Sequence, residues 1–188
     1  CGTGLITLML AQRNQTTNII GIEIDKEASE EAQLNVNCSR WANRINIENI
    51  PLQRYRSKIK FDLIVSNPPF FPKNHSNNTR DIARHTNTLS FEELIQNSAV
   101  LLSEEGIFSV IIAKDSEADF CKVAKISGLF PTRVCYVKGN EFSDIKRVMI
   151  EFSFLNQKIQ QENLVIEKER HKYTDDYISL CRPFYLHM

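Results

Sequence analysis

The segment with the clearest chemical potential is Asn67-Pro68-Pro69-Phe70, which follows an apolar run at residues 61–66. The run is typical of a buried parallel strand, so the segment is expected at a strand's carboxyl end. Two successive prolines remove two backbone donors and fix φ at about −65°. Each proline also holds the residue before it in an extended conformation. We therefore expect rigid, unpaired oxygen acceptors at this strand end.

Two rigid acceptors suit the chemistry of an amino group on an aromatic ring, which is a poor nucleophile because its lone pair is delocalised. The Asn67 side-chain oxygen and the Pro68 carbonyl could bind both amino hydrogens and localise the lone pair for in-line attack on a sulfonium methyl group. Phe70 offers a flat face for an unstacked base, worth roughly 1–3 kcal/mol. We predict that Asn67, Pro68, Pro69 and Phe70 form a catalytic loop that needs no metal.

A glycine turn and a strand-ending acid form a second candidate site. In doubly wound sheets, ligands bind beyond the carboxyl ends of the strands. Gly2 and Gly4 would let the backbone approach such a ligand closely, and Glu23 would accept hydrogen bonds from ribose hydroxyls. Asp25 is expected to cap the next helix. A nicotinamide or flavin site uses the same logic, although the full G-x-G-x-x-G spacing is absent.

Short apolar runs alternate with amphipathic segments along the chain, which predicts a Rossmann-like, doubly wound α/β fold. Two consecutive strands near the end add an antiparallel edge to a mostly parallel sheet. The glycine turn needs a strand before Cys1, so we expect one domain, 1–188, that is N-terminally truncated. Helices are expected at 5–12, 25–39, 90–102, 117–126 and 177–186, strands at 18–24, 45–50, 61–66, 107–113, 132–138, 147–154 and 164–166, and a polar loop at 72–88.

The composition is that of an ordinary globular protein, with 42% apolar and 24% charged residues. No apolar run is long enough to predict a membrane span. The 5 cysteines are scattered, with no C-x-x-C pair, and the 4 histidines lack metal-ligand spacing. This pattern argues against a disulfide framework or a zinc site and favours a cytoplasmic location.

The formal net charge is zero, which gives no global case for a nucleic-acid partner. A local group of cations follows the predicted catalytic loop, and these residues are candidates for phosphate contacts. They are Lys73, Arg80, Arg84 and His85. A solvated charged loop is the alternative interpretation.

The order of the glycine turn, Glu23 and Asn67-Pro68-Pro69-Phe70 resembles class I S-adenosylmethionine-dependent methyltransferases. More narrowly, the chain resembles the bacterial enzymes that N6-methylate adenine 37 of valine tRNA. The likeness covers essentially the whole chain, and its most specific parts are residues 4–13, 39–45, 80–85, 173–177 and 184–186. The resemblance implies a seven-stranded sheet, S-adenosylmethionine as cofactor and a tRNA substrate. It also implies that Asn67 and Pro68 hold the target amine and that Phe70 stacks on the base.

One departure and several alternatives remain at this stage. The resemblance leads us to expect an acid after the third strand, where Pro51 stands instead; that contact is lost, or is made by a backbone group or by Asn49. The Asn-Pro-Pro motif is shared with guanine N2 rRNA methyltransferases and glutamine N5 methyltransferases of release factors. A non-catalytic RNA-binding protein of the same fold is another alternative, and a nicotinamide dehydrogenase is a more distant one. The sequence leaves the oligomeric state open.

Overall fold

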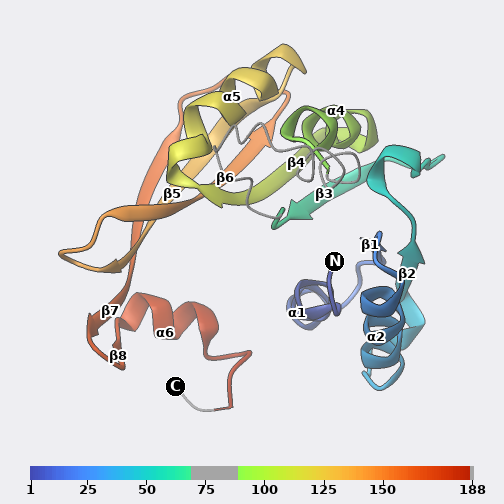
Figure 1. Cartoon of the computed structure of the whole chain (residues 1–188), viewed down its shortest axis with the longest axis horizontal. Coiled ribbons are helices and arrows are strands. Elements are labelled where there is room, and N and C mark those ends of the chain that lie inside the picture. Colours follow the sequence, from blue (N-terminus) through green and yellow to red (C-terminus); the bar gives the residue numbers. More distant parts are fainter. Residues whose placement is uncertain (69–88, 187–188) are drawn as a thin grey trace, which may run out of the picture. The chain divides into compact units, whose positions relative to one another are not determined.

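The structure is a computed structural model that describes residues 1–68 and 89–186 (Figure 1). It divides into two compact units, Cys1–Arg56 and Ser57–Met188, which are described separately. The prediction of a single domain stays a prediction. Several predicted site residues lie outside the described residues: Pro69, Phe70, Lys73, Arg80, Arg84 and His85.

The first unit contains a parallel pair of strands and two helices. Its elements are α1 (Leu5–Arg13), β1 (Ile19–Glu23), α2 (Lys26–Asn37), η1 (Ala42–Arg44), β2 (Ile45–Asn49) and η2 (Leu52–Arg54). In the β1–β2 ladder, Ile19 lies opposite Ile45 and Glu23 opposite Asn49. A parallel pair needs a crossover connection, and α2 supplies it. Both strand ends that carry predicted site residues, Glu23 and Asn49, are therefore neighbours.

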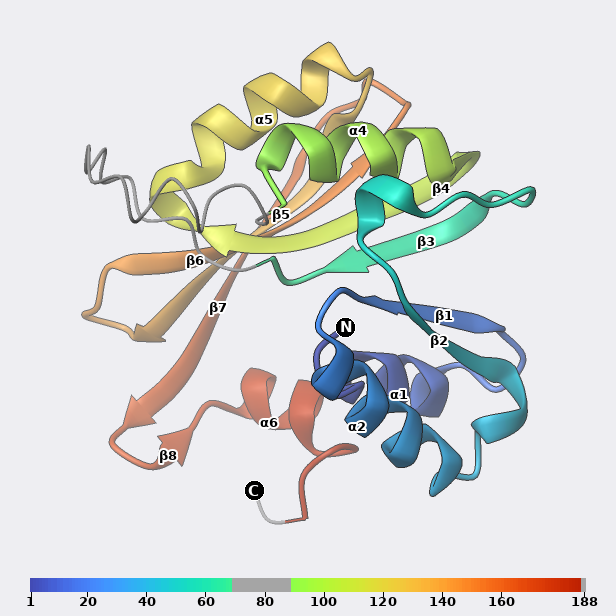
Figure 2. The ribbon, with the colours of Figure 1, turned by 45° about the vertical axis from the view of Figure 1, so that its right-hand side comes forward.

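The core of this unit joins both helices to the strands. Ala11 of α1, Val36 of α2 and Ile45 of β2 form one buried cluster, and Trp41 packs against it. Figure 2 shows α1 and α2 on the same side of the strand pair. Asp25 caps α2 as predicted, because its Oδ1 accepts a hydrogen bond from the Ala28 N–H at 2.8 Å.

The second unit is built on a six-stranded sheet with the order β3-β4-β6-β5-β7-β8. Its strands are β3 (Phe61–Ser66), β4 (Leu102–Ala113), β5 (Phe130–Asn140), β6 (Ile145–Ser153), β7 (Gln160–Glu169) and β8 (Lys172–Tyr173). Its helices are α4 (Phe91–Leu101), η3 (Lys114–Ser116), α5 (Glu117–Ile126) and α6 (Asp175–Cys181). None of the helices in the described parts of the chain is long and apolar enough to cross a membrane.

The strand directions confirm the predicted Rossmann-like, mostly parallel architecture, but the antiparallel strand β6 does not lie where we predicted it. β4 is parallel to β3, and β7 is parallel to β5, whereas β6 is antiparallel to both β4 and β5. The prediction of an antiparallel edge is therefore wrong for β6, which lies inside the sheet. The hairpin folds back so that its second strand joins β4, and the alternation pattern alone does not specify this partner. At the true edge, the short β8 is antiparallel to β7.

One face of this sheet is covered by α4 and α5, as Figures 1 and 2 both show. Phe108 of β4, Phe120 of α5 and Phe152 of β6 are fully buried between them. The Phe120 and Phe152 ring centroids are 5.7 Å apart. Buried residues alternate along β4, as the period of two of a strand requires.

Three element boundaries differ clearly from the predicted ones. β4 begins at Leu102 rather than near residue 107, and Leu102 pairs with Phe61 of β3. Gly106 lies within this longer strand, where a Cβ atom would be 2.8 Å from the Phe61 carbonyl oxygen. β7 has 10 residues instead of three, since pairing with β5 recruits a polar stretch. α6 begins at Asp175 behind its cap Thr174 and ends at Cys181.

Candidate active site

The glycine turn has the predicted geometry, and its two glycines serve different purposes. Gly2 and Gly4 have φ of 57° and 87°, in the region that disfavours residues with a Cβ atom. A Cβ atom on Gly4 would lie 3.3 Å from the Ala32 Cβ, whereas one on Gly2 would meet nothing within 4 Å. Gly4 is thus required for packing of α1 against α2. Gly2 leaves an open backbone face.

Glu23 lies against this turn and is held by backbone donors. Its Oε2 accepts hydrogen bonds from the Gly2 N–H at 2.7 Å and from the Cys1 nitrogen at 2.9 Å. Its Oε1 accepts one from the Asp25 N–H at 3.0 Å. Burial raises the pKa of Glu23, whereas hydrogen bonds to its carboxylate, among them those from the Asp25 and Gly2 N–H groups, lower it, and the net shift is downward. The structure therefore brings Gly2 together with an ionised Glu23.

Asn49 ties the ends of the two parallel strands together. Its side-chain nitrogen donates hydrogen bonds to the carbonyl oxygens of Glu23 at 3.0 Å and Ile24 at 3.1 Å. Pro51 follows as the cap of η2, with its carbonyl accepting from the Arg54 N–H at 2.9 Å. The predicted cofactor residues Gly2, Glu23 and Asn49 are thus linked through Glu23, and Gly4 holds the helix behind them.

Asn67 and Pro68 occupy the carboxyl end of β3, as predicted. The last ladder pair is Ser66 with Val110, so Asn67 is the first residue beyond the sheet. Asn67 is exposed and Pro68 is buried. Within residues 1–68 and 89–186, no hydrogen bond engages the Asn67 side chain. A buried proline thus anchors an exposed amide at this strand end.

A polar cluster that the sequence did not reveal lies where the neighbouring strand β4 ends. The Lys114 ammonium forms an ion pair with Glu117 and lies 5.1 Å from the centre of the Tyr136 ring. The Tyr136 hydroxyl donates to Glu117 Oε1 at 3.0 Å. The hydrogen bond to Glu117 raises the pKa of Lys114, and burial followed by the same carboxylate raises that of Tyr136. The i,i+3 spacing could have indicated the first pair, but Tyr136 arrives from a distant strand.

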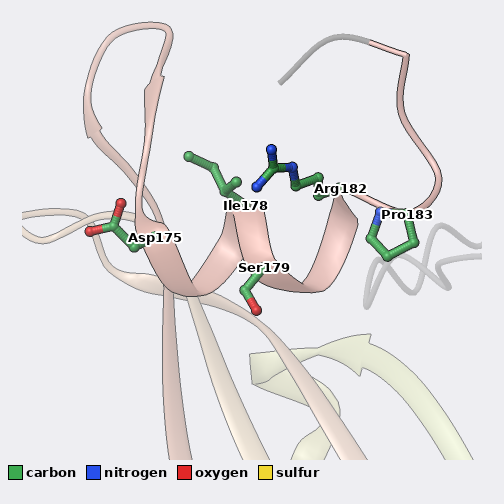
Figure 3. A pocket seen from close by; sticks show the side chains of 5 residues that line it. All are labelled: Asp175, Ile178, Ser179, Arg182 and Pro183. Atoms are coloured by element: carbon green, nitrogen blue, oxygen red, sulfur yellow. The ribbon is translucent and has the colours of Figure 1, made fainter.

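A hollow of about 500 Å³ lies beside α6 (Figure 3). It is lined by Asp175, Ile178, Ser179, Arg182 and Pro183. In Figure 3, Ile178 and Arg182 project from one side of the helix and Ser179 from the other. All five belong to one short stretch of chain, and none is a predicted site residue. This hollow is therefore not the candidate active site.

The amino-acid sequence is similar to those of known methyltransferases. Residues 1–143 match the methyltransferase small domain family. The chain is 44% identical to a tRNA1(Val) (adenine(37)-N6)-methyltransferase from Flavobacterium psychrophilum, over 100% of this chain and 82% of that protein. It is 40% identical to the protein of the same name from Bacteroides fragilis, over 100% of this chain and 81% of that protein.

Solved structures agree at the level of the fold. A predicted O-methyltransferase from Agrobacterium tumefaciens superposes with a TM-score of 0.71 at 17% identity, covering 97% of this chain and 86% of that one. An O-methyltransferase from Brevibacillus brevis, solved with S-adenosyl-L-homocysteine, gives a TM-score of 0.54 at 17% identity, covering 72% of this chain and 46% of that one. The chain therefore belongs to the methyltransferase small domain family and, within it, to the family of bacterial tRNA1(Val) (adenine(37)-N6)-methyltransferases.

Proposed function

We propose that this protein transfers a methyl group from S-adenosylmethionine to the N6 amino group of adenine 37 in tRNA1(Val). The observation that carries the proposal is the 44% identity over the whole chain to a relative named for this reaction. The exposed Asn67 amide, anchored by the buried Pro68 at the end of β3, supports it independently, because it is the acceptor that amine methylation needs. We place the enzyme in the cytoplasm, where tRNA is modified.

The residues of the first unit fit the proposed cofactor. An ionised carboxylate is a strong acceptor for the ribose hydroxyls of a nucleoside, and the hydrogen bonds from Gly2 and Asp25 help to keep Glu23 in that form. An open backbone face, which Gly2 provides, allows close approach of a ligand. We assign Gly2 and Glu23 to cofactor binding, with Asn49 fixing the strand ends. S-Adenosylmethionine, when bound, supplies an activated methyl group on a sulfonium centre.

The residues after β3 are proposed to act on the adenine. The Asn67 side-chain oxygen and the Pro68 carbonyl accept the two amino hydrogens, so that the nitrogen lone pair is directed away from the ring. The prolines restrict the backbone that carries both groups, and this preorganisation lowers the barrier by aligning dipoles with the charge that develops. Pro69 stiffens the segment and Phe70 stacks on the base, two roles that rest on the sequence. Lys73, Arg80, Arg84 and His85 are proposed phosphate contacts on the same basis.

The proposal is tested by methyl transfer from radiolabelled S-adenosylmethionine to a tRNA1(Val) transcript, followed by nucleoside identification. We expect label in N6-methyladenosine, and none with a transcript in which adenine 37 is replaced by guanine. Parallel reactions with ribosomal RNA and with a release factor cover the two alternative acceptors of the Asn-Pro-Pro motif. Label in N2-methylguanosine or in a glutamine side chain would contradict the assignment.

A further inference from the structure

The hairpin between β5 and β6 has an almost fully exposed aromatic side chain at its tip. Phe142 is 94% exposed, more than any other phenylalanine in the described residues. A single exposed apolar residue needs no explanation by itself. The structure of the turn, its place in the sheet and the charges around it set this one apart.

The turn that carries Phe142 is held in one conformation by its own hydrogen bonds. The Phe142 N–H donates to Asn140 Oδ1 at 3.0 Å, and the Asn140 N–H donates to Ser143 Oγ at 2.9 Å. The Ser143 N–H closes the turn on the Asn140 carbonyl at 3.2 Å. Such asparagine and serine contacts fix a turn without help from the rest of the protein. Phe142 is therefore displayed from an ordered support, which reduces the entropy lost when it binds a partner.

The strand register places this tip at the same end of the sheet as Asn67. Ser66 pairs with Val110, Val110 with Ile150, and Ile150 with Val134, so Val134 is level with the end of β3. β5 continues for six residues to Asn140 (140 − 134 = 6), which at about 3.3 Å per residue is roughly 20 Å. Figure 2 shows the β3 and β4 arrows and the β5–β6 turn directed to the same side. The hairpin thus extends beyond the carboxyl edge that carries the proposed catalytic residues.

Lysines flank the tip on both strands. Lys138 and Lys146 form no ion pair with any described residue, and the Lys138 ammonium contacts the Glu141 carbonyl oxygen at 3.4 Å. Val137 pairs with Arg147 and Lys138 with Ile145, so Lys146 is the extra residue of a β-bulge. Bulges re-aim side chains and are frequent beside active sites. These cations suit a polyanion.

The tip also contains the acids Glu141 and Asp144, and the neighbouring strand adds a further cation. Asn140 pairs with Glu167, so the turn after β7 lies next to the β5–β6 turn. That turn carries the exposed Arg170. On the β5–β6 hairpin itself, Lys138, Lys146 and Arg147 outnumber Glu141 and Asp144 by one, while Glu167 and Arg170 on the neighbouring segment balance each other. The two acids of the hairpin allow a test in which the expected change has the opposite sign.

We propose that the β5–β6 hairpin is a second RNA-binding element, in which Phe142 stacks on an unpaired base while Lys138 and Lys146 bind adjacent phosphates. This inference rests on the proposed function and names a contact of the same substrate. β5 is three strand spacings from β3, about 14 Å, so Phe142 lies on the order of 25 Å from Asn67. The stacked base is thus a different nucleotide from the methylated adenine. The hairpin therefore favours an RNA in which these two nucleotides lie at this separation.

Variants of Phe142 test the stacking contact through tRNA binding and methylation kinetics. Phe142→Ala is expected to raise both the dissociation constant of a fluorescent tRNA1(Val) transcript and KM for tRNA about tenfold. Phe142→Trp should retain affinity, and Phe142→Leu should behave like the alanine variant because it lacks a ring. Calorimetry should show unchanged S-adenosylmethionine affinity. Ile126→Ala is the matched control, since Ile126 is 79% exposed at the end of α5, where β5 is about to begin.

Charge variants test the phosphate contacts with opposite expected signs. Lys146→Ala should weaken tRNA binding and reduce the slope of log affinity against log salt by about 1. Glu141→Gln should strengthen binding, because it removes a like charge beside the RNA backbone. Lys125→Ala on α5 removes an exposed lysine elsewhere and should change neither value. A general effect on folding would move both hairpin variants in the same direction.

The outcomes separate this inference from the proposed function. If the wild-type protein methylates tRNA1(Val) and Phe142→Ala binds it as tightly, the hairpin contact is wrong and the proposed function stands. If the wild-type protein neither binds nor methylates tRNA, both are overturned. If Phe142→Ala instead halves the mass measured by light scattering, the hairpin is a contact between copies of the chain, and RNA binding there is overturned.

Discussion

At the residue scale, the proposed chemistry depends on a polar side chain, at the end of a strand, whose amide forms no hydrogen bond with the described residues. Asn67 follows Ser66, the last residue of β3 that pairs with β4, and its side-chain amide is exposed. The buried Pro68 fixes the direction in which the chain continues. Glu23 is the last residue of β1, and the backbone N–H groups of Gly2 and Asp25 help to keep it ionised.

Asn67→Ala should separate catalysis from cofactor binding. Loss of one acceptor for a developing charge is expected to lower kcat about 100- to 1000-fold. The affinity for S-adenosylmethionine should stay within about twofold, because the lost contact is made to the amine. Single-turnover methylation and calorimetry check the two values, with Asn163→Ala on β7 as the control. An equal loss of kcat and cofactor affinity would contradict the assigned role.

Glu23 should make stability depend on acid pH. Because its pKa is lowered in the folded state, its contribution is fully present above the unfolded value, near 4.5, and is lost as pH falls through the folded pKa. The difference in unfolding free energy between wild type and Glu23→Gln should therefore shrink as pH falls below about 4.5. Urea titrations followed by Trp41 fluorescence measure this, since Trp41 packs in the same unit. A difference independent of pH would show that charge is not involved.

At the element scale, the local chemistry of turns and caps sets where helices begin. Ser90 opens α4 with a capping box: its Oγ accepts from the Glu93 N–H at 3.1 Å, and the Ser90 N–H donates to Glu93 Oε2 at 2.9 Å. Asp25 does the same work for α2 with a single bond. The glycine turn before α1 has no such side-chain cap, so its backbone conformation is what positions the helix.

The two glycines of this turn should differ in their tolerance of alanine. Gly4→Ala combines left-handed backbone strain with the 3.3 Å contact to Ala32 and is expected to cost about 2 kcal/mol of stability. Gly2→Ala carries the strain alone, and about 1 kcal/mol is expected. Urea unfolding monitored at Trp41 compares them. If Gly2→Ala proved the more damaging to stability, the packing role assigned to Gly4 would be wrong.

The cap of α4 gives an independent check on the second unit. Ser90→Ala removes the acceptor for the Glu93 N–H and should destabilise the protein by about 1 kcal/mol. Gln96→Ala, at an exposed position inside the same helix, should be neutral or slightly stabilising, because alanine is the better helix former. Thermal unfolding followed by far-UV circular dichroism compares the two. Equal effects would mean that the cap is not what starts the helix.

At the scale of the whole molecule, ligand binding should appear as a gain in stability. A ligand at 100 times its dissociation constant stabilises the native state by about 2.7 kcal/mol. We expect S-adenosylmethionine to raise the melting temperature of the wild type and of Asn67→Ala equally, and that of Glu23→Gln much less. Differential scanning calorimetry with and without the cofactor measures this. Loss of the shift in Asn67→Ala with retention in Glu23→Gln would reverse the proposed roles.

Local pattern determined much of this protein without any tertiary information. The apolar run ending at Asn67, the cap at Asp25 and the helix start at Ser90 are all where the sequence predicts them, and β3 matches its predicted range of 61–66. These features depend on backbone conformation and on contacts within a few residues, which the sequence encodes directly. The motif order and its flanks also indicated the family that the comparisons support.

Only the tertiary structure decided which distant segments meet. The insertion of β6 between β4 and β5, the full length of β7 and the contact of Tyr136 with Glu117 all join residues that are far apart in the chain. So does the close packing at Gly4, since its neighbour Ala32 lies on α2. Alternation shows which side chains share a face, but strand partners are chosen by the competition among all possible pairings. That competition is settled by the whole fold, and it is what places Phe142 beyond the sheet edge that carries Asn67.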